Sequence, residues 1–169
     1  MELLQGIRVL DDLYDLCKAH HVYTQVTFTG GNPLLYPYFN ALYQEAADCG
    51  FMTAILGNPM PRKRIEEIIA LQKPEFYQVS LEGMQVQNDS IRGAGHFART
   101  LDFLDLLREL GIYSMVMLTL TRANMDEVMA LAELLWNRVD LFTFNRLAMV
   151  GEGAALASVA PEDFPVFFA

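Results

Sequence analysis

Two glycines, an asparagine and a proline follow one another at residues 30–33, directly after a stretch rich in β-branched and aromatic residues. Glycine lets the backbone adopt positive φ and brings its N–H and C=O groups close to a ligand. Asn32 is a residue type that caps helices, and Pro33 suits the first helical turn. The segment therefore fits two interpretations: a tight turn before a capped helix, or a backbone site at Gly30 and Gly31 for a small polar ligand.

A second group of polar residues extends from Ser80 to Gly93. Ser80 and Glu82 are two positions apart at the end of an apolar stretch, so in a strand their side chains share one side. The Glu82 carboxylate could accept hydrogen bonds from ribose hydroxyls, and the Arg92 guanidinium could bind a carboxylate with two parallel hydrogen bonds. The alternative is that Glu82 and Arg92 form an ion pair within a loop.

The histidines and cysteines do not have the spacing of metal ligands. We expect the histidines, His20, His21 and His96, to be solvated or to cap helices. Cys17 lies on an apolar helical stripe and is expected in the core, whereas Cys49 ends a helix. Because the two cysteines are 32 positions apart and form no CxxC pair, they do not predict a metal site within this chain. The sequence has neither a Ser-His-Asp arrangement nor a Walker loop, so no catalytic residue is assigned.

These candidate residues lie between segments that alternate between helical and strand patterns. Apolar residues at spacings of three and four predict helices at 2–20, 34–49, 61–72, 96–110 and 124–137. Apolar runs rich in β-branched and aromatic residues predict strands at 21–29, 51–56, 76–81, 112–120 and 140–147, with a polar loop at 82–95. This alternation is typical of an α/β fold with a parallel sheet. The five units are too few for a closed eight-stranded barrel, so we expect one domain over residues 1–169 with an open sheet or a partial TIM-type (βα) barrel.

Ligands of parallel α/β sheets bind at the carboxyl ends of the strands. This rule selects the segments 29–33, 57–58, 80–92, 119–124 and 145–153, which should face one rim of the sheet. In the fourth segment, Asn124 stands three residues before Glu127, a spacing that predicts a helix cap and a mainly structural role.

The composition excludes several classes of protein. With 12 Lys+Arg against 21 Asp+Glu, the 169 residues carry a formal net charge of −9, which argues against binding a nucleic-acid phosphate backbone. A hydrophobic content of 53% rules out intrinsic disorder, no apolar run is long enough to span a bilayer, and no signal peptide is visible. Two cysteines suit a reducing compartment, so we expect a cytoplasmic location. The mean hydropathy of +0.20 indicates apolar surface meant for a partner, a second copy or further chain.

Several segments together resemble the radical SAM enzymes. VTFTGGNPLLYP resembles the second strand and GGE motif of that family, and LGNP stands where the family often has a TNG turn. QVSLEG followed by NDSIRG is similar to the fourth-strand segment of the peptide-modifying members, and LFTFNRLAMVGEGA is similar to the sixth-strand segment. The likeness covers nearly the whole chain, in the same order and spacing. Among subfamilies, it points to the thio(seleno)oxazole-modifying peptide maturases.

Members of this family bind S-adenosylmethionine (SAM) on a [4Fe–4S] cluster and cleave it to a 5′-deoxyadenosyl radical, which abstracts hydrogen from the substrate. The resemblance implies an oxidoreductase that modifies a peptide or protein. It also implies that backbone oxygens of Gly30, Gly31 and Asn32, in the motif that ends with Pro33, meet the methionyl amino group.

The resemblance assigns further residues to the methionyl carboxylate, the ribose and the adenine. By this resemblance, Ser80 and Arg92 hold the methionyl carboxylate. Asn58 or Glu82 faces the ribose, and Thr119 with the backbone near Leu147 lines the adenine.

Two departures from the family pattern change the expectation. The three cluster cysteines of the family, CxxxCxxC, do not occur in this sequence. We therefore expect a fragment of a longer enzyme, cut at both ends, which lacks the first strand and the cluster ligands and is inactive by itself. The acidic third residue of GGE is Asn32 here, and an amide attracts an ammonium group less than a carboxylate does. Without the first strand, the strand at 21–29 has an unpaired edge, which predicts a homodimer or another ordered contact at that edge or across the open face.

Two other classes of protein compete with this interpretation. A non-catalytic module could bind an extended peptide by adding it to the exposed sheet edge. A Rossmann-type nucleotide-binding protein is disfavoured, because the GxGxxG fingerprint is absent from the sequence.

Overall fold

The chain forms a five-stranded parallel sheet in the computed structural model, which describes residues 2–167. The strands stand side by side in chain order: β1 (Gln25–Phe28), β2 (Met52–Leu56), β3 (Phe76–Ser80), β4 (Ser114–Leu120) and β5 (Leu141–Arg146). The predicted parallel sheet is confirmed. The first strand is shorter than the predicted range of 21–29.

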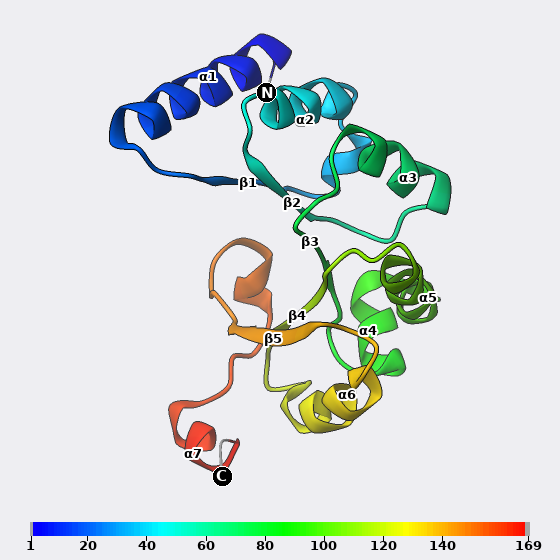
Figure 1. The fold of residues 1–169 in the computed structure, drawn as a ribbon. Helices are drawn as coiled ribbons and strands as arrows, with labels where there is room; N and C mark the ends of the chain where they lie inside the picture. Colours follow the sequence, from blue (N-terminus) through cyan, green and yellow to red (C-terminus); the bar gives the residue numbers. More distant parts are fainter. Residues whose placement is uncertain (1, 168–169) are drawn as a thin grey trace.

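The helices lie on one face of the sheet. The connecting helices are α2 (Phe39–Asp48), α3 (Arg62–Leu71), α4 (Gln85–Arg92), α5 (His96–Glu109) and α6 (Val128–Leu135). α1 (Leu3–His20) precedes the first strand and packs on α2. Because each new strand is added on the same side of its predecessor, right-handed crossovers place every connecting helix on the same face. Figure 1 shows these helices along the outer side of a curved sheet. This is the arrangement of a partial (βα) barrel, whereas a Rossmann sheet reverses its strand order.

Two predicted elements were wrong in part. The predicted loop at 82–95 contains the helix α4, whose single buried residue is the polar Asn88, so no apolar stripe marks this helix in the sequence. The predicted helix at 34–49 is instead a 3₁₀ turn (Pro33–Leu35) followed by α2. Between them Tyr36 is extended at ψ 127°, as expected for a residue that precedes a proline. The structure therefore has more helices than the five predicted.

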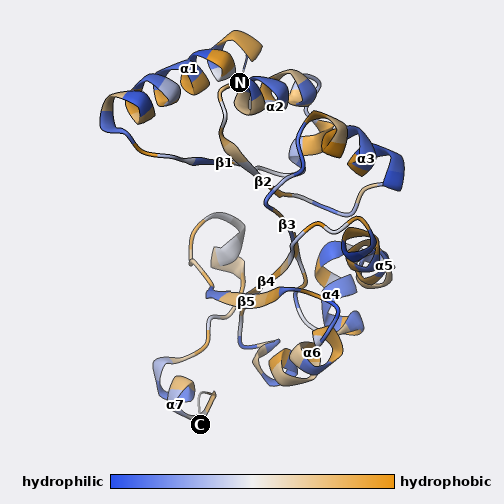
Figure 2. Cartoon of the chain, in the orientation of Figure 1, coloured by the Kyte–Doolittle hydropathy of each residue, from blue (hydrophilic) through white to orange (hydrophobic). Residues whose placement is uncertain are grey.

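The main core lies between the sheet and these helices. Alternate strand residues such as Ile55, Tyr77 and Val116 are fully buried there. The Tyr77 ring meets Phe103 of α5 edge-on, with ring centroids 5.0 Å apart. In Figure 2 the ribbons of the helices carry both hydrophilic and hydrophobic colours, as expected for elements that bury one face.

The other face of the sheet carries the intervening strand residues and is uncharged. By register this face consists of Gln25, Thr27, Met52, Ala54, Leu56, Phe76, Gln78, Ser80, Met115, Met117, Thr119, Leu141, Thr143 and Asn145. We call it the open face. Its strand residues are neutral polar or apolar, although one-fifth of the whole chain is charged.

A smaller core joins α1 to α2 beside the edge strand β1. It is built on Leu10, Cys17, Leu42, Ala46 and Phe51. The prediction that Cys17 is a core residue is confirmed. β1 pairs with β2 alone among the described strands, so one edge of the sheet is free within residues 2–167.

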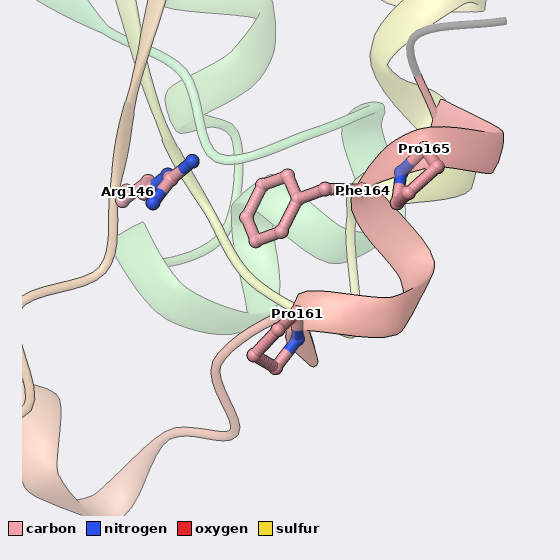
Figure 3. A pocket seen from close by; sticks show the side chains of 4 residues that line it. All are labelled: Arg146, Pro161, Phe164 and Pro165. Atoms are coloured by element: carbon pink, nitrogen blue, oxygen red, sulfur yellow. The ribbon is translucent and has the colours of Figure 1, made fainter.

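The segment after β5 crosses the end of the sheet and returns to the helical side. It contains the 3₁₀ turns Gly151–Ala155 and Pro161–Asp163 and the short helix α7 (Phe164–Phe167). The Arg146 guanidinium lies 4.4 Å from the centroid of the Phe164 ring, at a cavity that Pro161 and Pro165 also line (Figure 3). Residues 168 and 169, at the end of the predicted domain, lie outside the described residues.

Across residues 2–167, no helix combines the length and the apolar character that crossing a membrane requires.

Candidate functional site

The carboxyl ends of β1, β2 and β3 enclose a polar cavity of about 260 Å³. Its wall consists of Thr29, Gly30, Gly31, Leu56, Gly57, Asn58, Gln78, Ser80 and Arg92. Five of the residues selected from the sequence therefore lie together: Gly30, Gly31, Asn58, Ser80 and Arg92. We call this space the rim cavity. It lies where ligands bind in parallel α/β folds.

The glycine segment exposes its backbone to the rim cavity. Gly30 and Gly31 have φ of +103° and +49°, and no atom lies within 4 Å of where a Cβ would stand. The Asn32 side chain accepts a hydrogen bond from the Leu34 backbone N–H at 3.4 Å and so caps the 3₁₀ turn that Pro33 begins. The predictions of positive φ and of a cap are both confirmed. A capped turn and an accessible backbone occur together here, and do not exclude each other.

A hydrogen bond from the buried Tyr77 of β3 fixes the turn after β2. The Tyr77 hydroxyl donates a hydrogen bond of 2.8 Å to the carbonyl oxygen of Asn58. A Cβ on Gly57 would lie 2.7 Å from that hydroxyl oxygen, so glycine leaves the room that this hydrogen bond needs. Burial raises the pKa of Tyr77, which keeps the hydroxyl protonated as a donor.

Glu82 and Arg92 form an ion pair, which was one of the two alternatives left by the sequence. One carboxylate oxygen of Glu82, Oε1, accepts from Nε and Nη2 of Arg92, and the Nε distance is 3.1 Å. The other oxygen, Oε2, accepts from the backbone N–H of Thr119 at 3.4 Å. Glu82 is 7% exposed and does not line the rim cavity, and its predicted contact with ribose stays a prediction.

Two other predicted residues lie beyond the wall of the rim cavity. Thr119 stands on the open face opposite Asn145 of β5. Leu147 follows β5, and its side chain lies 3.3 Å from where a Cβ on Gly153 would stand. Their predicted contacts with adenine stay predictions.

Two buried asparagines hold this end of the sheet together, and sequence reasoning did not find this role. The side chain of Asn124 accepts from the Thr121 N–H at 2.8 Å and donates to the carbonyl oxygens of Glu82 and Thr119 at 3.2 and 2.9 Å. It therefore joins two strand ends and makes no helix cap. The expected partner of that cap, Glu127, accepts instead from the Met84 N–H at 2.6 Å.

Asn88 of α4 binds the backbone N–H of Glu82, whereas Asn124 binds its backbone carbonyl oxygen. Its Oδ1 accepts from the Glu82 N–H at 3.1 Å, and its Nδ2 lies 3.1 Å from Nδ1 of His96. His96 is 8% exposed, so the prediction of a solvated or capping histidine was wrong at this position. The sequence does not reveal the buried contact between Asn88 and His96, because asparagine and histidine are both common on protein surfaces.

Burial lowers the pKa of His96, and the charges of Arg92 and Arg99 add to this effect. The unfolded chain therefore binds a proton at His96 more readily than the folded chain does. As the pH falls through the ordinary value of 6.5 toward the lowered value, the unfolded state gains protons and stability decreases.

We expect His96→Gln to flatten the acid side of the stability profile. Between about pH 7.5 and about pH 5 the melting temperature of the wild type should fall further than that of the variant. Thermal melts followed by circular dichroism measure this difference. His20→Gln, a change at an exposed histidine, is the control and should keep the wild-type slope. A His96→Gln profile as steep as that of the wild type would contradict the assignment.

The cysteines of this chain do not fit an iron–sulfur cluster. The sequence has two cysteines, whereas [4Fe–4S] clusters are held by more thiolates than that. Cys17 and Cys49 line another cavity with Tyr14, Tyr23 and Phe51, at the amino-terminal ends of β1 and β2 and away from the rim cavity. Burial and nearby acidic residues raise the pKa of Cys49, which disfavours the thiolate that a metal requires.

Fold and cavity together define a class of protein: a partial (βα) barrel whose polar ligand cavity lies at the carboxyl ends of its first strands. Residues 4–135 match the family model of the Radical SAM superfamily. The chain belongs to this superfamily, whose members use SAM and a [4Fe–4S] cluster.

The known proteins that resemble the chain differ in what they act on. The S-adenosyl-L-methionine-dependent tRNA 4-demethylwyosine synthase of Pyrococcus horikoshii is 34% identical over 100 residues, which are 56% of this chain and 29% of that protein. SuiB of Streptococcus suis superposes with a TM-score of 0.72 at 18% identity, over 94% of this chain and 38% of SuiB. TYW1 with a lysine-pyruvate adduct bound superposes with a TM-score of 0.61 at 21% identity, over 98% of this chain and 58% of TYW1. The chain thus spans less than a third of the curated relative, and the two superpositions show a shared fold.

Proposed function

We propose that this chain forms the SAM-binding part of a radical SAM oxidoreductase that modifies a peptide or protein. The observation that carries the proposal is the rim cavity, which is lined by the exposed glycines Gly30 and Gly31, by Ser80 and by Arg92. These groups match the methionyl end of SAM, which presents an ammonium group and a carboxylate. When bound with its cluster, SAM supplies a 5′-deoxyadenosyl radical that abstracts hydrogen from the substrate.

The task of the chain itself is to bind and orient SAM. Carbonyl oxygens at Gly30 and Gly31 accept from the ammonium group, and the neutral Asn32 leaves this contact to the backbone. Ser80 and Arg92 donate to the carboxylate, and a guanidinium can do so with two parallel hydrogen bonds. Asn58, the other predicted residue of the cavity wall, faces the ribose. No step through the cluster is assigned to this chain, because its two cysteines do not fit one.

Two observations support a peptide or protein substrate. The open face beside the rim cavity offers methionine, aromatic and neutral polar side chains and no cation for phosphate groups. SuiB, which shares the fold, has been crystallised bound to a precursor peptide. A homodimer through the free edge of β1 and a cytoplasmic location remain predictions.

Modification of tRNA is the second candidate, and the identity of 34% to a tRNA 4-demethylwyosine synthase favours it. The excess of 21 acidic over 12 basic side chains opposes it. Electrophoretic mobility with bulk tRNA separates the two: we expect no shift at physiological salt, and a salt-dependent shift would favour the tRNA candidate.

The SAM site is tested by titrating the isotope-labelled 169-residue chain with SAM and following backbone amide resonances by NMR. We expect weak binding, on the order of millimolar, because the chain lacks the cluster to which SAM would also bind. The shifted resonances should be those of Gly30, Gly31, Gly57 and Ser80. Gly50, at the cavity with the cysteines, serves as the internal control and should stay unchanged. No shift at the rim cavity, or shifts confined to Gly50 and its neighbours, would overturn the proposal.

A further inference from the structure

Both oxygens of the Glu82 carboxylate accept hydrogen bonds from within the protein. Its side chain is 9% exposed, and both oxygens accept hydrogen bonds, Oε1 from Arg92 and Oε2 from the Thr119 N–H. Because protein donors occupy both carboxylate oxygens, little hydrogen-bonding capacity remains for a ligand. Its effect on a ligand must therefore pass through the groups that it binds.

The main chain of Glu82 is fixed as firmly as its side chain. The N–H donates to Oδ1 of Asn88 at 3.1 Å, and the carbonyl oxygen accepts from Nδ2 of Asn124 at 3.2 Å. Both asparagines are fully buried, and they come from different elements, α4 and the turn after β4. Because buried amides with satisfied hydrogen bonds are rigid, the carboxylate has a fixed position relative to β3 and β4.

Arg92 is the group through which Glu82 reaches the rim cavity. It stands at the last position of α4 with a side chain that is 31% exposed, and it lines the cavity. The Nε–H and Nη2–H groups of Arg92 donate to Glu82. The N–H groups on Nη1 of Arg92 have no protein acceptor within residues 2–167. A guanidinium has five N–H donors in a rigid plane, so fixing one edge of it aims the other.

We infer that Glu82 is a positioning residue that aims the Arg92 guanidinium at the carboxylate of a zwitterionic ligand in the rim cavity. This inference rests on the proposed function and replaces the ribose contact expected for Glu82. The carboxylate also balances the charge of Arg92, so the site favours an amino-acid end, with one ammonium and one carboxylate, over a simple anion. Arg92 contacts the ligand, whereas Glu82 acts on the ligand only through Arg92.

The experiment is a double-mutant cycle in which binding is measured by NMR titration with SAM and with decarboxylated SAM. Glu82→Gln keeps the shape of the side chain and removes its charge. It should weaken SAM binding by about three- to tenfold, because charge-assisted hydrogen bonds are the stronger ones. Decarboxylated SAM, which keeps the ribose and lacks the carboxylate, should bind both proteins equally. In the Arg92→Ala background, Glu82→Gln should change SAM affinity by less than about twofold.

A direct role of Glu82 toward ribose gives the opposite results and would overturn the inference. Glu82→Gln would then weaken both ligands, and it would do so with or without Arg92. Glu109→Gln, at an exposed ion pair with Arg62, is the matched control and should leave both affinities unchanged. If the wild type binds no SAM, the proposed function itself fails, which is a different outcome from unequal variants.

A second variant decides the matter if Glu82→Gln does not fold. Arg92→Lys keeps the positive charge but has no Nε–H for Glu82 to hold and no rigid plane. We expect it to lose SAM affinity by about tenfold and to bind decarboxylated SAM like the wild type. Unchanged SAM affinity in Arg92→Lys would show that orientation of a planar group does not matter, and would overturn the inference.

Discussion

Replacing Arg92 with alanine is expected to weaken SAM binding by about 10- to 100-fold, the largest effect of any single change at the rim cavity. A hydrogen bond to a charged group contributes about 1.5–3 kcal/mol, and each 1.4 kcal/mol is about tenfold in affinity. Among the residues 2–167 that line the cavity, Arg92 is the one cationic residue, so no other described residue of the wall replaces its charge. The variant also leaves the buried Glu82 carboxylate without its ion-pair partner. NMR titration of both proteins with SAM measures the ratio of dissociation constants.

Arg99→Ala is the matched control for this prediction. Arg99 lies one helix further along the chain, where its Nη1 donates to the carbonyl oxygen of Ala94 at 3.2 Å, and it lines a different cavity. Its removal deletes the same charge from the same region of the protein and should change SAM affinity less than about twofold. Equal and small effects of the two variants would remove Arg92 from the site.

The sheet and half of its cavity wall could be predicted because both depend on local signals. A buried parallel strand is an apolar run, and a pair of glycines directly after a strand permits the positive φ that a tight turn uses. Gly30 and Gly31 therefore follow from residue type alone, and the topological rule adds Asn58, Ser80 and Arg92. No long-range information is needed to place these five at one rim, because parallel strands share the direction of their carboxyl ends.

The hydrogen-bonded cluster of Glu82, Asn88 and Asn124 could not be predicted, because its hydrogen bonds join residues that are not neighbours in the sequence. Asn124 bonds to Glu82 across 42 positions, and nothing near Asn124 in the sequence indicates this. Its one local signal, Glu127 three residues later, favoured a helix cap that does not form. For the same reason the sequence left open whether Glu82 meets Arg92 or a ligand. The hydrogen bonds of Glu82 with Asn88 and Arg92 of α4 and with the Thr119 N–H show that Glu82 meets Arg92.

Asn124→Ala is expected to reduce the free energy of unfolding by about 2–4 kcal/mol, the largest stability effect that we predict. Its side chain serves an N–H at Thr121 and carbonyl oxygens at Glu82 and Thr119, all at the buried end of the sheet. Truncation leaves these groups without this partner, and each buried unsatisfied polar group costs about 1–3 kcal/mol. Urea denaturation followed by circular dichroism should show a lower midpoint with an unchanged slope.

Two further variants separate a hydrogen-bonding role of Asn124 from simple loss of volume. Asn124→Asp keeps the shape and the acceptor for Thr121 but replaces the amide donor, so a carboxylate oxygen faces the carbonyl oxygens of Glu82 and Thr119. Because like-charged oxygens repel, we expect this variant to be at least as unstable as Asn124→Ala near neutral pH. Asn40→Ala, at an exposed position of α2, is the control and should change stability by less than about 0.5 kcal/mol. If Asn124→Asp is as stable as the wild type, the amide donor does not hold the strand ends together, and the rigid support inferred for Glu82 is lost with it.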